Sequence, residues 1–220
     1  MRIPASRRKT ASEETRTLIL AAAKDLYTEK GYKEVPIREL AAKAGVAEGT
    51  IFSHFPDKAS LLAAAVIEEV DSALAEAFTT IPKKAACTEK LLHIARHLYS
   101  HYGENPILWR AYLKESIFLS GEWGDRIRQS VEEFIEYVSS LIEEEKRKGA
   151  YAPVTDSQAA ARLYFSAYFF ELLAGLSAPE FDLDTMYANL NSAVDQWERG
   201  LQVKTKIEAA SRSTSKESES

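Results

Sequence analysis

Three histidines are spaced so that they could bind a metal ion. His93, His97 and His101 follow one another at intervals of four residues, so on one helix their imidazoles would lie along one slowly drifting flank. Imidazole nitrogen is a common zinc ligand, so the row could contribute to a metal site. Only Cys87 and Glu89 could add ligands nearby. We therefore interpret the histidines as surface or pocket-lining residues, and we expect no metal and no cofactor.

A second group of residues could contact DNA. Gly49 would let the backbone approach a phosphate, and Thr50 offers a hydroxyl and a methyl, suited to a phosphate oxygen or a thymine methyl. Lys58 could pair with a phosphate at the positive N-terminal end of the helix that it begins. The candidate DNA contacts are Arg38, Ala47, Glu48, Gly49, Thr50, Phe52, Ser53, His54 and Lys58, with Arg7, Arg8 and Lys9 as residues that could lie along a minor groove.

Short helices must present these side chains. Apolar residues at helical spacing predict helices over 13–30, 36–44, 47–54 and 57–78. Ser12 is the expected N-cap of the first helix, and the basic residues 1–11 read as a flexible arm. Gly45 allows the positive φ that reverses the chain, and Val46 would fill the angle between two short helices. Two short helices joined through Ala-Gly-Val are typical of a helix-turn-helix unit.

The segment from Val35 to Leu62, VPIRELAAKAGVAEGTIFSHFPDKASLL, resembles the DNA-binding domain of the TetR (tetracycline-repressor-like) family. The resemblance extends from the first helix into the fourth, and it includes Gly31-Tyr32, the stretch from Leu40 to Val46, Gly49-Thr50, Phe55 and Lys58. It implies a DNA-binding regulator with a ligand cavity among the middle helices. It also implies that the last two helices pack against a two-fold partner as a four-helix bundle.

Two positions depart from the family's pattern. Family members usually have tyrosine at the position of Phe52, so the phosphate-binding hydroxyl is absent and Phe52 would pack against sugar or a thymine methyl. A serine or threonine often caps the third helix where this chain has Ala47. That change removes a side-chain cap of about 1 kcal/mol. Neither departure removes the resemblance.

The remainder of the chain is predicted to be helical throughout. No alternating strand pattern or hairpin signal is found beyond Pro82. The expected helices are 88–103, 105–120, 125–148, 156–177 and 182–204, separated by glycines and prolines at Gly103, Gly121, Gly124, Gly149, Pro153 and Pro179. The fold class is therefore all-α. We expect an arm and helix-turn-helix domain over 1–56, a helical effector-binding and dimerisation domain over 57–205, and a disordered tail over 206–220.

Aromatic residues are concentrated in the helical remainder, and the family resemblance implies that some of them line an effector pocket for an apolar or aromatic molecule. Glu115 and Glu171 lie in apolar surroundings, where each carboxylate needs a partner, such as Arg110 or Arg162. The candidate pocket residues are Tyr99, Tyr102, Trp109, Tyr112, Glu115, Phe118, Phe134 and Tyr137. The candidate dimer-interface residues on the last two helices are Tyr168, Leu172, Gly175, Tyr187, Leu190, Val194 and Trp197.

Composition and charge limit the class of protein. The chain has 220 residues, 45% hydrophobic and 28% charged, as in ordinary globular proteins. We expect a cytoplasmic protein, because no apolar run could span a bilayer and no signal peptide is recognisable. The net charge is −5, but residues 1–58 contain 11 Lys and Arg against 8 Asp and Glu, so the first quarter is basic. This asymmetry favours a DNA-binding N-terminal part on an acidic remainder.

The sequence therefore predicts a homodimeric transcriptional repressor, with no enzymatic activity, that leaves a palindromic operator when a small effector binds. A ligand-dependent activator of the same fold and a metal-responsive regulator that uses the histidine row remain alternatives. A helical enzyme would need a nucleophile with its base or a full metal set, and only the histidine row comes near. A helical interaction module without DNA binding would show no salt-dependent affinity for DNA.

Overall fold

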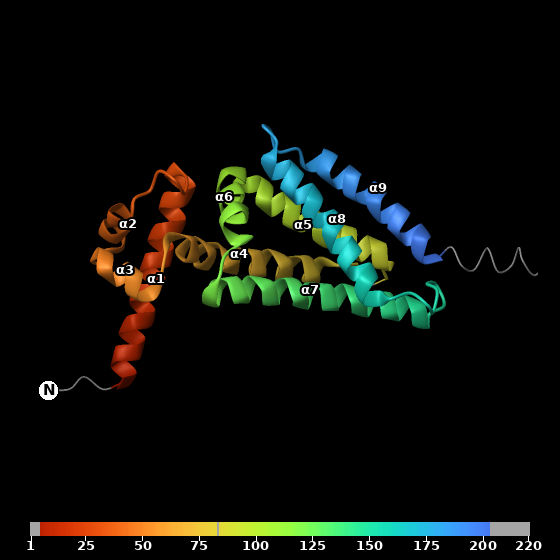
Figure 1. Ribbon diagram of the computed structural model, residues 1–220, viewed down its shortest axis with the longest axis horizontal. Helices are drawn as coiled ribbons and strands as arrows, with labels where there is room; N and C mark the ends of the chain where they lie inside the picture. Colours follow the sequence, from red (N-terminus) through yellow and green to blue (C-terminus); the bar gives the residue numbers. More distant parts are fainter. Residues whose placement is uncertain (1–4, 83, 203–220) are drawn as a thin grey trace, which may run out of the picture. The chain divides into compact units, whose positions relative to one another are not determined.

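The computed structural model describes residues 5–82 and 84–202, with side chains from residue 10 onward. These residues form nine α-helices and no strand (Figure 1), which confirms the predicted all-α fold. The helices are α1 (Ala5–Lys30), α2 (Ile37–Ala44), α3 (Glu48–His54), α4 (Lys58–Thr80), α5 (Cys87–Glu104), α6 (Pro106–Ser116), α7 (Gly121–Arg147), α8 (Ser157–Ser177) and α9 (Leu183–Gln202).

The first helix begins earlier than the sequence analysis predicted. α1 starts at Ala5, so residues 5–11 are helical and the prediction of a flexible arm is wrong for them. Ser12 lies inside α1 and does not cap it. This segment contains neither glycine nor proline, so nothing in it interrupts a helix. The side chains of Arg7, Arg8 and Lys9 and the tail from Lys206 lie outside the described residues, and their roles stay predictions.

The start of α7 also differs from the prediction. Gly121 has a left-handed φ of +73° and does separate α6 from α7. Gly124 was expected to be a second break, but it lies within α7 and is buried. A Cβ at Gly124 would lie 2.0 Å from the carbonyl oxygen of Leu119, so glycine is needed here for close packing against the turn.

Packing divides the chain into two compact units, which we call the head and the body. The head comprises Met1–Ala75 and Glu104–Arg128, and the body comprises Glu76–Gly103 and Gln129–Ser220. The division falls within α4 and α7, each of which contributes residues to both units. The domain boundaries predicted at residues 56 and 205 stay predictions.

Each unit has an apolar core of its own. In the head, α1 packs on α2 and α2 on α3. The buried side chains there include Ile19, Leu26, Tyr27, Val35, Leu40, Ile51, Phe55, Leu61 and Leu62. In the body, α8 and α9 form a closely packed hairpin (Figure 1). The buried side chains of the body include Leu91, Ile94, Tyr99, Val138, Ile142, Ala161, Tyr164, Leu190 and Val194.

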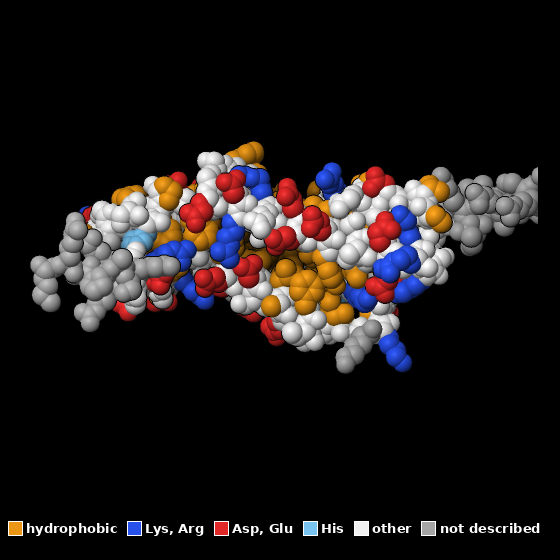
Figure 2. Space-filling model, turned by 90° about the horizontal axis from the view of Figure 1, so that it is seen from below, with side chains coloured by type: hydrophobic (Ala, Val, Ile, Leu, Met, Phe, Trp, Pro, Cys, Tyr) orange, Lys and Arg blue, Asp and Glu red, His pale blue; other side chains and the backbone are white. Residues whose placement is uncertain are grey.

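The surface carries charges of both signs. Figure 2 shows one face on which acidic and basic side chains are interspersed, with an area of hydrophobic side chains among them. Such mixing agrees with the modest net charge of −5. Among the described residues, the helices are too short or too polar for any of them to span a membrane.

Candidate nucleic-acid interface

The turn between α2 and α3 is built by Gly45. Its φ of 69° lies in the left-handed region, where only glycine is free of steric cost. The Gly45 amide donates to the Ala42 carbonyl at 3.3 Å, and the Val46 amide donates to the Ala41 carbonyl at 2.9 Å. This pair of bonds is the Schellman arrangement that ends a helix and redirects the chain. The predicted role of Gly45 is confirmed, and the turn fixes the direction in which α3 leaves α2.

Helix α3 buries one side and exposes the other. Ile51 is 1% exposed, and Phe55, just after the helix, is fully buried. Glu48, Gly49 and Ser53 are exposed, and Phe52 leaves half of its surface in solvent. An aromatic ring that is half exposed on a short helix is available for contact with another molecule. The side of α3 that carries Phe52 is therefore the candidate contact surface.

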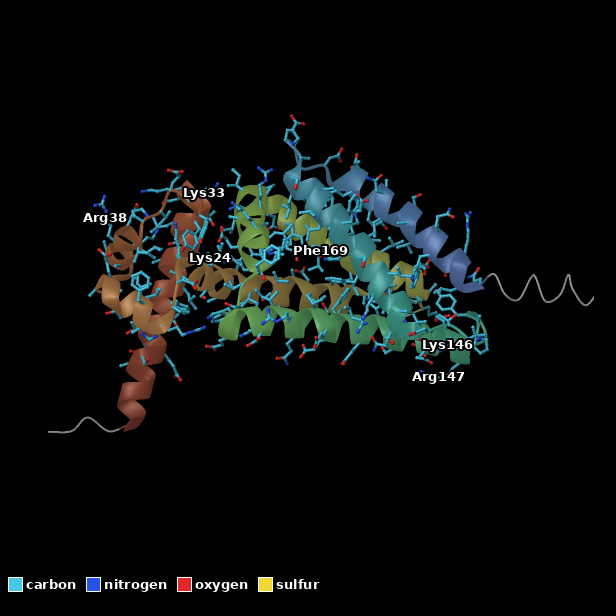
Figure 3. All side chains as sticks on the ribbon, viewed as in Figure 1. Lys24, Lys33, Arg38, Lys146, Arg147 and Phe169 are labelled. Carbon is cyan, nitrogen blue, oxygen red and sulfur yellow. The ribbon has the colours of Figure 1, made fainter. Side chains whose placement is uncertain are left out.

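The polar residues of α3 occupy different positions on this surface. Ser53 donates from its hydroxyl to the Thr50 carbonyl at 2.7 Å, so in this structure its side chain is engaged with its own helix. Thr50 and His54 are half-buried. Ala47 occupies the N-cap position without a side-chain hydrogen bond, as its residue type requires. Arg38, on α2, is exposed and extends outward from the helix (Figure 3).

Lys58 lies in a more enclosed place than the sequence suggested. Its ammonium donates to the Tyr32 carbonyl and lies 4.4 Å from the centre of the Tyr32 ring. Burial lowers the pKa of this ammonium, while the carboxylates of Glu115 and Glu34 act in the opposite direction. The predicted phosphate contact of Lys58 would therefore compete with its bond to Tyr32.

The sequence analysis did not single out Arg16. Its guanidinium lies 5.5 Å from the centre of the Phe55 ring and 5.4 Å from that of Trp123, at the start of α7. Trp123 is buried, so this cation–π group ties α1 and the end of the helix-turn-helix unit to α7 within the head. Arg16 precedes the apolar residues by which the sequence analysis identified α1. The spacing of those residues therefore gave no reason to single out Arg16.

The predicted pocket residues fall into two groups. Tyr99, Tyr102, Phe134 and Tyr137 belong to the body, where Tyr99 stacks on Tyr168 with ring centres 5.1 Å apart and donates to the Tyr168 carbonyl at 2.8 Å. Trp109, Tyr112, Glu115 and Phe118 belong to the head.

The predicted pocket residues in the head differ in exposure. Phe118 is 92% exposed, so its predicted role in a pocket finds no support in its surroundings. The reason is that α6 ends at Ser116, so the helical spacing that placed Phe118 on an apolar stripe no longer applies. Trp109 is buried and meets Tyr112 edge to face at 5.7 Å. Glu115 is half-buried and acts electrostatically on Lys58, a partner that the sequence analysis did not suggest.

Most of the predicted dimer-interface residues lie inside one protomer. Tyr168, Leu172, Gly175, Leu190 and Val194 are buried, and Trp197 donates to the Ala160 carbonyl at 3.0 Å. Other parts of the same chain cover these residues: Tyr168 stacks on Tyr99 of α5, and Gly175 faces Met186 of α9. Their part in a subunit contact stays a prediction. The spacing showed an apolar excess but could not tell an internal hairpin from a subunit contact. Large apolar side chains that α8 leaves exposed are Leu163, Phe170 and Leu173. Tyr187 stays half-buried under the Arg96 guanidinium.

Two histidines of the row, His93 and His97, lie beside the hydroxyl of Thr80. The Nε2 atoms of His93 and His97 lie 3.0 and 3.3 Å from the Thr80 hydroxyl. Within the described part of the chain, no group of three His, Cys, Asp or Glu could hold a metal ion. Cys87 is buried, and burial raises the pKa of its thiol to about 12, so it stays protonated. Glu171 accepts a hydrogen bond from Asn189 at 3.1 Å.

Comparisons with known proteins agree with this geometry. Residues 19–65 match the family model described as bacterial regulatory proteins, tetR family. The HTH-type transcriptional repressor KstR of Mycobacterium tuberculosis is 28% identical over 167 residues, which cover 76% of this chain and 73% of KstR.

Two solved regulators share the fold. FadR of Bacillus subtilis, in complex with stearoyl-CoA, has a TM-score of 0.64 at 21% identity, covering 84% of this chain and 98% of FadR. The repressor FadR of Thermus thermophilus, in complex with lauroyl-CoA, has a TM-score of 0.68 at 17% identity, covering 86% and 95%. The likeness therefore extends well beyond the matched N-terminal segment into the helical body.

Proposed function

Because the chain belongs to the TetR family of bacterial transcriptional regulators, we propose that it is a homodimeric repressor that binds a palindromic operator through α3. Two copies of α3 would enter successive major grooves about 34–36 Å apart. The protein would act in the cytoplasm, where its operator lies. A small apolar or aromatic effector would release it, because a ligand shifts an equilibrium only by binding one state more tightly than the other.

The observation that carries this proposal is the outward side of α3. Ile51 and Phe55 anchor the helix in the head, while Gly49, Phe52 and Ser53 are left in solvent. A helix anchored in this way is rigid, and its exposed side can meet the edges of base pairs. A helix that only completes a core would not need an aromatic side chain such as Phe52 on its exposed side.

Dimerisation is supported by the exposed apolar side chains of α8. Leu163 and Phe170 are each 64% exposed, and Leu173 is 40% exposed. Their spacing of seven and three residues puts them on one side of the helix. We propose that these three residues, rather than the buried ones named from the sequence, form the subunit contact, since exposed apolar patches of this kind mark interaction sites.

The effector class is suggested by the body and by the relatives. The body holds aromatic rings in contact, with Phe134 6.4 Å from both Tyr164 and Tyr168 between ring centres. The two FadR structures contain stearoyl-CoA and lauroyl-CoA. We propose long-chain acyl thioesters as the first effectors to test, because an acyl chain suits an apolar, aromatic lining.

The experiment starts by sequencing DNA fragments that the purified protein selects. Thr50→Ala is then expected to weaken operator binding about tenfold, or about 1.4 kcal/mol, while Thr79→Ala, on an exposed part of α4, leaves affinity unchanged. Lys58→Ala would weaken binding to all sequences and lower the salt slope by about one if Lys58 contacts a phosphate. Affinity that does not depend on salt, or a Thr50 variant that binds normally, would overturn the proposal.

A further inference from the structure

Helix α3 has little of its own to hold it in one orientation. It has seven residues, about two turns, and a helix of that length is marginal without tertiary contacts. Ala47 at its N-cap makes no side-chain hydrogen bond, and Ile51 is its one buried residue. Phe55, directly after the helix, is the second anchor and is fully buried. The direction of α3 therefore depends on how firmly the Phe55 ring is held.

The Phe55 ring contacts an arginine and a tryptophan from two other helices. The Arg16 guanidinium of α1 lies 5.5 Å from the centre of the Phe55 ring and 5.4 Å from the centre of the Trp123 ring of α7. The two rings are themselves 6.4 Å apart between centres. A guanidinium is attracted to the electron-rich face of an aromatic ring, so one cation binds both rings here. Arg16 therefore joins α1 and α7 at the end of α3.

The two rings are the contacts that place the Arg16 side chain. It is half-buried, and its guanidinium forms neither an ion pair nor a hydrogen bond with any residue that the structure describes. Ile19, three residues later and on the same side of α1, is fully buried, so this side of α1 faces the core of the head. A change at Arg16 therefore alters the support of the Phe55 ring without breaking an ion pair elsewhere.

The Trp123 side of this contact is fixed independently of α3. Trp123 lies in the first turn of α7 and is 6% exposed. On the same helix, the Arg126 guanidinium lies 5.8 Å from the centre of the Trp123 ring and forms an ion pair with Asp71 of α4 at 3.1 Å. The start of α7 is thus attached to α4 beside the indole. Trp123 therefore offers Arg16 a surface whose position does not depend on the helix-turn-helix unit.

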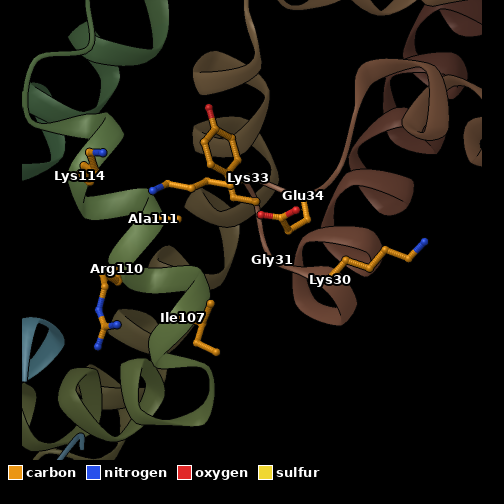
Figure 4. Close-up of a pocket in the computed structure, with 9 residues that line it drawn as sticks. Lys30, Gly31, Lys33, Glu34, Ile107, Arg110, Ala111 and Lys114 are labelled. Atoms are coloured by element: carbon orange, nitrogen blue, oxygen red, sulfur yellow. The ribbon is translucent and has the colours of Figure 1, made fainter. Parts of the chain in front are cut away.

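At the other end of α1, the contact with α6 is incomplete. The loop after α1 and one side of α6 line a hollow of about 300 Å³ (Figure 4). Across a hollow of this size the two walls do not pack against each other as they would in a core. The attachment of the helix-turn-helix unit to α6 and α7 therefore depends on contacts elsewhere in the head, and the Arg16 group is one of them.

We propose that Arg16 is a positioning residue for operator binding, which holds the end of α3 in place by stacking on Phe55 and Trp123. It acts on DNA through α3 and makes no contact with DNA of its own. A binding surface has to be held within about 0.5 Å of its productive geometry, so a loosened anchor lowers affinity even when the fold is intact. This inference rests on the proposed function, because it assigns Arg16 a part in operator binding.

The first test measures the affinity of the full chain for the operator that it selects. Arg16→Gln removes the cation and should weaken binding about tenfold, whereas Arg16→Lys keeps a cation over the rings and should restore most of the affinity. The salt dependence of binding should stay the same in Arg16→Gln, because a residue that touches no phosphate releases no counterion. Arg96→Gln is the matched control. It removes a guanidinium that lies 4.8 Å from the Tyr187 ring centre in the body, and operator affinity should not change.

The second test needs no DNA. In ¹⁵N NMR spectra of the full chain, Arg16→Gln should shift the indole N–H signal of Trp123 and the backbone amide signals of α3. Arg96→Gln should move neither group of signals. Trp123→Phe leaves a ring that attracts a cation less strongly. In that background Arg16→Gln should weaken operator binding by a smaller factor than it does alone, as expected for two residues that act as a unit.

Three outcomes would overturn the inference. One is normal operator affinity in Arg16→Gln. Another is a salt slope lower by about one, which would show that Arg16 contacts a phosphate directly. The third is a spectrum in which the α3 amide signals stay in place, which would make Arg16 a local packing residue. In all three cases the unchanged protein still binds its operator, so the proposed function is intact. An unchanged protein that binds no DNA would overturn the proposed function and this inference together.

Discussion

The head and the body are both helical, but their sequences mark the buried side of each helix with very different clarity. In the head, α2 and α3 have eight and seven residues, and α3 buries only Ile51. In the body, α8 has 21 residues with apolar side chains on nearly every side. Phe170 is exposed and Tyr168 is buried, although neither residue type indicates which outcome to expect.

This difference explains why functional residues were easier to find in the head. A short helix between a left-handed glycine and a proline has few residues, so its outward side is nearly defined once its anchors are known. A long helix that is apolar all round must be buried by several partners at once. The sequence does not state whether those partners are helices of the same chain or of another.

The largest effect on stability in the head is expected from truncating the residue that anchors α3, compared with truncating its outward neighbour. Ile51→Ala should lower the free energy of unfolding by about 2–5 kcal/mol, because a fully buried isoleucine is lost from a close-packed core. Phe52→Ala removes a half-exposed ring from the next position and should cost far less stability. Urea unfolding at pH 7 measures both. Equal losses for the two variants would show that α3 has no outward side, and the contrast with α8 would disappear.

Much of the fold and part of the site could be read from the sequence. Gly45 and Gly31 marked helix ends because a left-handed φ selects glycine, and the spacing of Leu40, Ala41 and Ala44 marked a core side. The helix predicted over 105–120 ends at Ser116, before Phe118, because spacing cannot show where a helix stops when no proline or glycine follows at once. The Lys58 bond to Tyr32 joins residues 26 positions apart. Contacts of that kind depend on tertiary packing, and no local pattern encodes them.

A smaller effect is expected in the body, at the contact between α8 and α9. A Cβ at Gly175 would lie 2.1 Å from the Met186 sulfur, and Met186 is itself buried. Gly175→Ala should therefore lower the free energy of unfolding by about 1–3 kcal/mol through overpacking.

Gly200, in α9, is the matched control for this change. No atom lies within 4 Å of a Cβ built there, so Gly200→Ala should stabilise the helix by about 0.5–1 kcal/mol. Thermal unfolding measures both changes in stability, which should have opposite signs. If Gly175→Ala were also stabilising, the α8–α9 contact would be loose, and Gly175 would again be available for a subunit interface.

The smallest effect concerns the tyrosines buried in the body. Burial raises the pKa of the Tyr102 hydroxyl to about 12 from the ordinary value of 10.0. A raised pKa means that the folded state keeps its proton at a pH where the unfolded state has lost it. The stability from this group is therefore complete below pH 10 and decreases as the pH rises toward 12.

Tyr102→Phe removes this titration and should flatten the fall in stability between pH 10 and pH 11. The difference from the unchanged protein should be on the order of 1 kcal/mol over that unit of pH, since one proton is worth about 1.4 kcal/mol per pH unit at most. Chemical unfolding at several pH values measures the slope. An unchanged slope would mean that Tyr102 is as accessible to solvent in the folded state as in the unfolded one. The body would then be looser at this position than the stacked and hydrogen-bonded tyrosines beside it indicate.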